Sequence, residues 1–346
     1  MGIGVPNVHE AWAWYRKNFG MDVPVFEEAA TAELMLKYTG GQPHDRHAIL
    51  AINMQGGGGF EIWQYTSRTP EGPKQSIKLG DLGIYACKLK ARDVPKAFKE
   101  FDPEYRVSDK VHVAPNGDQH FFVKDPYGNM FQIVECPEVY METKSNIGGV
   151  YGAIIGCSNI LRSAMYYDAI LNYLFTKEEC DAKGKHQDLY DLPNGDATIH
   201  RCIMPARDDR AGGFSELLGP SQIEIIQLAE GESQANSIYE DRYWGDLGFI
   251  HLCFDVLNMP NLQAECLQGG FPFTVDSANT FDMGEAAGRF SYIEDPDGAL
   301  IEFVETQKIP IMKKLGWYLD LTKRKDRLKP LPRMMLKALA LNRKKN

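Results

Sequence analysis

Two segments of the chain carry the same pattern of apolar and polar positions. Residues 123–132 and 293–302 each consist of an apolar strand, an Asp-Pro-x-Gly turn and a second apolar strand. Pro fixes φ and Gly tolerates positive φ, so this composition is typical of a tight turn. The pattern therefore predicts a strand–turn–strand unit that occurs twice. The last inward position is Gln132 in the first copy and Glu302 in the second.

The repetition extends to other elements. Residues 60–64 and 223–227 match as strands with period-2 alternation, and residues 4–7 and 156–159 match just before a helical pattern. Each predicted helix has an apolar stripe at positions i, i+3 and i+7. These stripes are Trp12, Tyr15 and Phe19 in the first helix, and Ala164, Tyr167 and Leu171 in the second.

Each half divides again into two modules with the order strand, helix and three strands. The modules span about residues 1–66, 80–138, 147–229 and 244–306. The sequence thus predicts an α+β protein of four βαβββ modules. We expect an N-terminal domain at 1–140, a C-terminal domain at 147–306 and a basic, partly helical tail at 307–346.

Composition adds few restrictions. The chain has 346 residues, enough for two or three domains, and contains neither a signal-peptide pattern nor an apolar run long enough to span a bilayer. Its seven cysteines are an odd number without a Cys-x-x-Cys motif. Reduced thiols in the cytoplasm are the simplest interpretation.

Charge is divided unevenly along the chain. Residues 307–346 hold 13 Lys or Arg and two Asp, a net charge of +11, whereas the remainder holds 25 basic and 45 acidic residues, a net charge of −20. The acidic body argues against nucleic acid as a partner. In the tail, Ile311, Leu315 and Leu319 have helical i, i+4, i+8 spacing. Two roles remain open for the tail: peripheral contact with an anionic membrane, or packing on the acidic body.

The βαβββ order, with Asp-Pro-x-Gly-x-x-x-Glu closing the fourth module, resembles the vicinal-oxygen-chelate superfamily over about residues 1–306. That superfamily includes glyoxalase I, methylmalonyl-CoA epimerase, extradiol dioxygenases and bleomycin-resistance proteins. The resemblance implies two domains of this fold, which together form two curved mixed sheets. It also implies a divalent metal ion that chelates adjacent substrate oxygens.

Metal ligands in the superfamily lie on the first and last strands of each module. A first-strand His stands seven residues before the Asp or Asn that begins the helix, which is the relation of His251 to Asn258. The corresponding residues in the second and third modules are Ala86 and Gly152, and in the first module the position falls immediately before Met1. An upstream start that supplies this His is one hypothesis. The last-strand positions are Glu61, Gln132, Glu224 and Glu302.

These positions allow two different sites. If sequential modules pair, the ligands are Glu224, His251 and Glu302; if the first module pairs with the fourth, they are Glu61, His251 and Glu302. Loss of ligands in the two middle modules favours the second pairing. Imidazole and carboxylate donors suit Zn, Ni, Co, Mn or Fe, with the identity left open. Glu302, Glu61 and Glu224 are also the candidates for a general base.

The favoured function is a metal-dependent lyase or isomerase of the glyoxalase or epimerase type, acting through a metal-stabilised enediolate on a small oxygenated substrate. The first alternative is an iron-dependent extradiol-type dioxygenase, which needs a second His where Gly152 stands. The second is a metal-free protein that binds a small molecule. A monomer and a homodimer both remain open.

Overall fold

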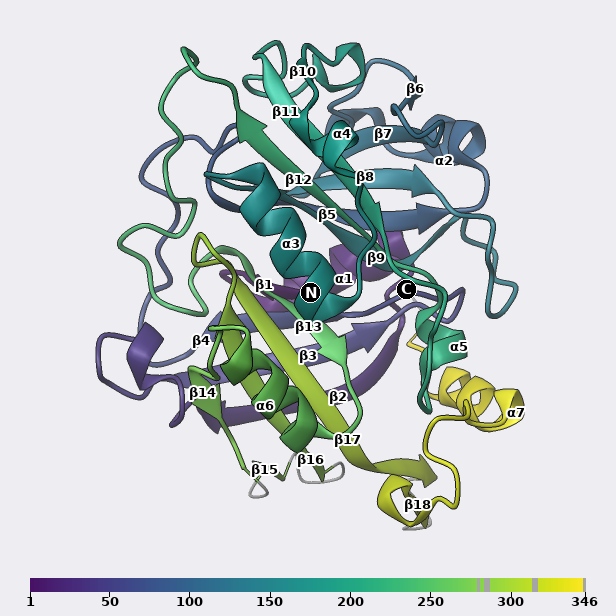
Figure 1. The fold of residues 1–346 in the computed structure, drawn as a ribbon. Helices are drawn as coiled ribbons and strands as arrows, with labels where there is room; N and C mark the ends of the chain where they lie inside the picture. The colour runs from purple at the N-terminus through teal and green to yellow at the C-terminus, as the bar shows by residue number, and fades with distance from the viewer. Residues whose placement is uncertain (279–280, 283–286, 313–316, 345–346) are drawn as a thin grey trace.

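The structure is a computed structural model that describes residues 1–278, 281–282, 287–312 and 317–344. In this part of the chain the strands form two mixed sheets (Figure 1). The first sheet has the strand order β14 (Val275–Asp276), β16 (Ala287–Glu294), β17 (Leu300–Met312), β13 (Gly248–Asp255), β1 (Gly2–Gly4), β4 (Phe60–Tyr65), β3 (Asp45–Ile52), β2 (Val23–Thr31), with β15 (Phe281–Asp282) on β16 and β18 (Trp317–Asp320) on β17.

The second sheet repeats this plan from the two middle modules. Its strand order is β10 (Lys183–Gly184), β11 (Ile199–Pro205), β12 (Gln222–Leu228), β9 (Ile147–Gly156), β5 (Gly83–Ala91), β8 (Met130–Glu135), β7 (Gln119–Lys124), β6 (His112–Val113). In every module the first and last strands pair in parallel, as the predicted βαβββ order requires. The predicted α+β class with two curved mixed sheets is confirmed.

Each sheet joins two modules through their first strands. Strand β1 pairs with β13 in an antiparallel manner in the first sheet, and β5 pairs with β9 in the same way in the second. The first module therefore pairs with the fourth, and the second with the third. Each sheet thus combines strands from 1–140 with strands from 147–306, and the domain boundaries themselves stay a prediction.

The helices are short and few. The α-helices are α1 (Val8–Phe19), α2 (Val94–Glu100), α3 (Ile160–Leu171), α4 (Lys177–Asp181), α5 (Ser215–Leu218), α6 (Met259–Gln268) and α7 (Arg333–Lys337). Short 3-10 turns are η1 (Leu36–Tyr38), η2 (Pro103–Tyr105), η3 (Gln187–Leu189), η5 (Leu321–Lys323) and η6 (Ala338–Asn342). The predicted stripes are the buried faces of α1 and α3, and Asn7 and Asn159 cap these two helices through their side-chain oxygens.

Helices α1 and α3 lie between the two sheets, and their buried faces pack into one large apolar core with both (Figure 1). Alternation along β4 shows how the sheet separates two environments. Phe60 and Ile62 point into this core, whereas Trp63 joins an aromatic cluster on the other face of the first sheet. We call this other face the open face. Glu61 has the same parity as Trp63 and lies on the open face as well.

Both Asp-Pro-x-Gly turns tie a helix to the neighbouring module. Tyr15 of α1 donates a hydrogen bond of 2.7 Å to Oδ2 of Asp125, and Tyr167 of α3 donates one of 2.9 Å to Oδ2 of Asp295. The other oxygen of each Asp accepts two backbone N–H groups of its own turn. The duplicated motif therefore fixes the turn and anchors the buried helix, which explains why both copies retain Asp.

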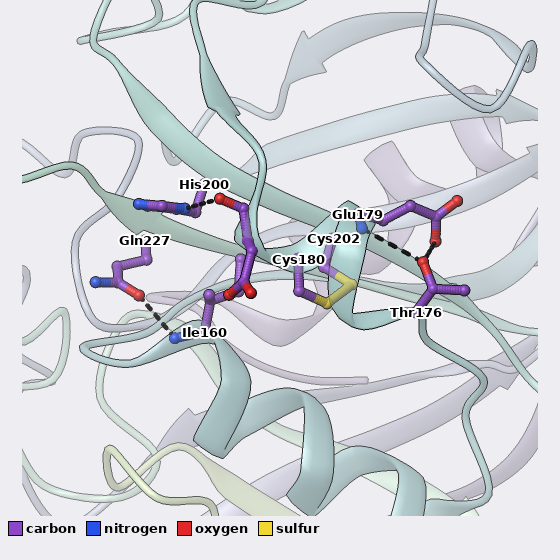
Figure 2. The surroundings of a disulfide bond; sticks show 8 residues. Ile160, Thr176, Glu179, Cys180, His200, Cys202 and Gln227 are labelled. Atoms are coloured by element: carbon purple, nitrogen blue, oxygen red, sulfur yellow. Dashed lines mark hydrogen bonds between the residues drawn. A yellow bond between two sulfur atoms is a disulfide. The ribbon is translucent and has the colours of Figure 1, made fainter.

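One expectation about the cysteines is wrong. Cys180 of α4 and Cys202 of β11 form a disulfide with a Cα–Cα distance of 4.7 Å (Figure 2), and the other five cysteines are free. A pairing of this kind depends on how α4 packs on β11, which spacing in the sequence does not reveal. The cytoplasmic location stays a prediction.

The tail differs from the helix predicted around Ile311. Strand β17 continues through Ile311, and Leu319 lies in β18, while Leu315 falls outside the described residues. Ile311 and Leu319 thus belong to two antiparallel strands that pair with each other, so the four-residue spacing does not reflect a helix. Further along, Leu321, Leu331 and Leu336 pack against the body in one apolar cluster.

Candidate metal centre

His251 lies at the middle of the first sheet, on β13, and its side chain is completely buried. In register it faces Gly2 on β1, and Gly2 is in turn the partner of Glu61 on β4. A Cβ atom at Gly2 would come within 2.5–2.8 Å of three ring atoms of His251. Glycine at this position therefore leaves the space that the imidazole fills.

Two carboxylates converge on the same ring nitrogen. Nε2 of His251 lies 3.2 Å from Oε2 of Glu302 and 3.3 Å from Oε2 of Glu61. Strand β17 brings Glu302 from one side, and β4 brings Glu61 from the other, across β1. The three ligand atoms lie within 4.8 Å of one another. The structure thus brings together the three residues expected for pairing of the first and fourth modules.

The geometry of these contacts fits ligands of a common ion. Nε2 of His251 is buried and has no hydrogen-bond partner in the described part of the chain, although two carboxylate oxygens are near. Ligand atoms about 2.0–2.1 Å from a tetrahedral Zn²⁺ lie about 3.3 Å apart, which matches the separations from His251 to Glu61 and Glu302. One imidazole and two carboxylates form a donor set that suits a divalent transition metal.

Tyr292 of β16 fixes the other side of the ring. Its hydroxyl lies 3.4 Å from Nδ1 of His251, and both side chains are buried. When Nε2 offers its lone pair to a ligand, Nδ1 carries the proton and donates to the Tyr292 oxygen. Such a partner orients a metal-binding imidazole and sets its tautomer.

The charges at this centre favour a cation. Burial lowers the pKa of His251, but the carboxylates of Glu302 and Glu61 outweigh burial and raise this pKa to about 9. Burial raises the pKa of Glu61, and the close contact with His251 and its positive charge outweigh that effect, so the net shift is downward. The two carboxylates thus hold a positive charge between them, either as a proton on the imidazole or as a metal ion.

Aromatic side chains line the open face around the centre. Trp63 and Trp244 meet edge to face with ring centroids 4.2 Å apart. Trp244 also stacks on His251, with ring centroids 6.3 Å apart. The Trp63 indole interacts with the Glu61 carboxylate, whereas the indole N–H of Trp244 is buried and has no hydrogen-bond partner among the described residues. One unused donor thus belongs to the same cluster as His251.

Glu224 does not join this centre. It lies on β12 of the second sheet, completely buried, and its carboxylate pairs with Lys88 at 2.6 Å and with Arg201 at 2.6 Å. Arg201 also pairs with Asp188, which contacts His120. The structure therefore does not bring Glu224 together with His251 and Glu302, because Glu224 lies in the other sheet.

Sequence reasoning did not find Tyr292, Trp244 or Lys88. A signal for Tyr292 exists in the repeat, because the matching position before the first Asp-Pro-x-Gly turn is Phe122. Phe122 packs in the apolar cluster of the second sheet, so only the copy that contains His251 carries a hydroxyl there. Trp244 lies in a connecting loop, where its position depends on tertiary structure.

Solved structures share this architecture. Over 88% of its length, this chain is similar to two single-residue variants of glyoxalase I from Zea mays, with 12% identity in both cases, TM-scores of 0.53 and 0.51, and coverage of 91% and 90% of those chains. A proposed dioxygenase from Bacillus subtilis is similar over 88% of this chain and 83% of its own, with 13% identity and a TM-score of 0.55. The chain has the vicinal-oxygen-chelate fold. At these identities the similarity concerns the fold alone.

No family model and no curated protein matches the sequence. In the described part of the chain, no helix is both long and apolar enough to cross a membrane. The vicinal-oxygen-chelate fold hosts several chemistries, so function has to be argued from the residues of the centre.

Proposed function

We propose that this vicinal-oxygen-chelate protein is a divalent-metal-dependent lyase or isomerase of the glyoxalase type, acting on a small oxygenated substrate. The observation that carries this proposal is the buried Nε2 of His251, which has no hydrogen-bond partner in the described part of the chain and stands 3.2–3.3 Å from Glu302 and Glu61. The metal, Zn, Ni, Co, Mn or Fe, would be held by these three residues. When bound, it would supply Lewis-acid polarisation of adjacent substrate oxygens.

Glu61 is the better candidate for the proton-transfer step. Its side chain is 21% exposed, whereas that of Glu302 is 10% exposed, so Glu61 has more access to a substrate on the open face. Glu61 would act as the base in its carboxylate form, because a positioned carboxylate accepts a proton from carbon. Glu302 then serves mainly to hold the charge at His251.

The aromatic lining supports binding of a substrate rich in oxygen. The indole N–H of Trp244 would donate to a substrate oxygen, because it has no hydrogen-bond partner in the described part of the chain. The rings of Trp63, Trp244 and Tyr292 also pack around the centre and limit access of water. Exclusion of water strengthens the charge interactions on which proton transfer depends.

The donor set also bears on the alternatives. A facial triad of an iron-dependent dioxygenase has two imidazoles and one carboxylate, whereas the centre has one imidazole and two carboxylates. Two carboxylates leave one free to move a proton, which suits a lyase or isomerase. A protein that binds its small molecule without metal does not require a buried Nε2 in contact with two carboxylates, so this geometry favours a metal site.

Metal content and proton exchange test the proposal together. We would reconstitute the purified protein with each of the five metals, count bound metal by plasma mass spectrometry, and follow deuterium uptake from D₂O into hydroxyacetone by NMR. The variants are H251A and E61Q, with H120A as the matched control, because His120 is the buried imidazole of the other sheet.

We expect equal metal content in the wild type and in H120A, one metal ion fewer per chain in H251A, and loss of exchange in E61Q, which keeps an oxygen donor. Equal metal content in H251A and the wild type would refute the proposal and favour a protein that binds its small molecule without metal at this centre. Iron binding with uptake of O₂ would favour the dioxygenase.

A further inference from the structure

A second cluster of metal-ligating side chains lies away from the open-face centre, at the edge of the first sheet. It consists of His9 in the first turn of α1, Glu27 on the edge strand β2 and His47 on β3. Oε1 of Glu27 lies 3.3 Å from Nε2 of His47 and 3.7 Å from Nε2 of His9. One ligand atom from each residue lies within 4.8 Å of the other two.

Hydrogen bonding does not account for this convergence. Nε2 of His47 is shielded from solvent and has no hydrogen-bond partner among the described residues, even though the Glu27 carboxylate is 3.3 Å away. The rings of His9 and His47 meet edge to face at 87°, with centroids 5.1 Å apart. Both imidazoles therefore turn the same nitrogen, Nε2, toward one carboxylate oxygen.

We propose that His9, Glu27 and His47 form an accessory site for a divalent transition-metal ion such as Zn²⁺. Two imidazole nitrogens and one carboxylate oxygen make a donor set that zinc and its neighbours prefer over Mg²⁺ or Ca²⁺. The 3.3 Å separation equals the spacing of two ligands on a tetrahedral ion with bonds of about 2.0–2.1 Å. Water would complete the coordination, since the side chain of His9 is 60% exposed.

An ion at this site would cross-link three elements. It would join the start of helix α1 to β2, which ends the first sheet, and to the adjacent β3. Binding to the folded chain alone stabilises it by linkage. The accessory site therefore supplies a metal-dependent clamp at the edge of the first sheet, and it is independent of the proposed reaction at His251.

Counting bound zinc tests the site. We would dialyse metal-depleted protein against Zn²⁺, measure zinc per chain, and record Tm with and without Zn²⁺ for the wild type, H9Q, H47Q, H251A and H44Q. H44Q is the matched control, because His44 lies just before β3 and its Nδ1 contacts Ser67 outside the cluster. His9 is exposed, so H9Q keeps the measurement independent of any folding defect in H47Q.

We expect H9Q and H47Q each to bind one zinc fewer per chain than H44Q, and to lose part of the zinc-dependent rise in Tm. Equal zinc content and equal Tm shifts in H9Q, H47Q and H44Q would overturn the proposal. If the function proposed for His251 fails instead, H251A will bind as much zinc as the wild type while H47Q still loses one.

Discussion

Nζ of Lys88 lies 2.6 Å from Oε2 of Glu224, at the place in the second sheet that corresponds to the candidate metal centre of the first. Glu224 is the last-strand carboxylate of its module, as Glu302 is in the fourth. In the first sheet a carboxylate faces an imidazole with an unused nitrogen, whereas in the second it faces two protein cations, Lys88 and Arg201. In the second sheet, protein cations thus neutralise the buried carboxylate of Glu224. In the first sheet, the carboxylate of Glu302 has no lysine or arginine partner among the described residues and can bind a metal ion.

The first prediction concerns this ion pair. Replacing Lys88 by Met leaves Glu224 buried with Arg201 as its remaining cation, so the free energy of unfolding should fall by about 3–5 kcal/mol. Urea denaturation would measure the change. K96M is the control, since Lys96 is 55% exposed and lies 3.9 Å from Glu100, a type of surface pair that contributes about 0–1 kcal/mol. Equal losses in K88M and K96M would contradict the role assigned to Lys88.

Acid should weaken the protein through the same network. Burial raises the pKa of Glu224, but Arg201 and Lys88 outweigh burial and lower this pKa to about 2. The pKa of Asp188 is also lowered to about 2, because His120 and Arg201 outweigh its burial. Unfolded carboxyl groups titrate near pH 4. A carboxyl group with a depressed folded-state pKa adds stability above pH 4, and this stability disappears as the pH falls toward 2.

Urea midpoints at pH 6, 4 and 3 would reveal this loss. E224Q removes one of the two carboxyl groups, so its midpoint should fall less steeply between pH 4 and pH 3 than that of the wild type. A parallel decline in both proteins would show that Glu224 does not drive the acid sensitivity.

Much of the fold was predictable because local rules repeat in the sequence. The Asp-Pro-x-Gly turns and the stripes around Tyr15 and Tyr167 are set by φ restrictions and helical period, and the structure retains all of them. His251, Glu61 and Glu302 were expected from the resemblance to the vicinal-oxygen-chelate superfamily, in which ligands occupy set positions of each module. Which modules pair is a property of strand order, and the structure decided it in favour of the first with the fourth.

Other features depend on partners that are distant in sequence. The sequence does not show that the lysine of a strand is buried. The burial of Lys88 depends on its ion pair with Glu224, which lies on another strand. The disulfide between Cys180 and Cys202 likewise requires α4 to pack on β11. The stripe at Ile311 was misread because Ile311 lies on β17 and Leu319 on its antiparallel partner β18, a pairing that spacing along the chain does not reveal.

Tyr292 should raise the metal affinity of the candidate metal centre without being a ligand. Y292F removes the hydroxyl that lies 3.4 Å from Nδ1 of His251, and loss of such a partner commonly weakens metal affinity by about 10–100-fold. Competition with a chromophoric chelator would measure the affinity. Y166F is the matched control, because the buried hydroxyl of Tyr166 has no hydrogen-bond partner in the described part of the chain. Similar affinities in the two variants would argue against the Tyr292 contact.

Gly2 should be required for the imidazole to occupy its position. The Cβ atom introduced by G2A would lie 2.5–2.8 Å from ring atoms of His251, closer than carbon contacts allow, so the ring or strand β1 has to move. We expect G2A to lose metal and about 1–3 kcal/mol of unfolding free energy, as overpacked cores do. G184A is the control, since a Cβ at Gly184 has no neighbour within 4 Å. Retention of full metal content by G2A would mean that His251 does not need the space over Gly2. The register that aligns His251, Gly2 and Glu61 would then not be required for metal binding.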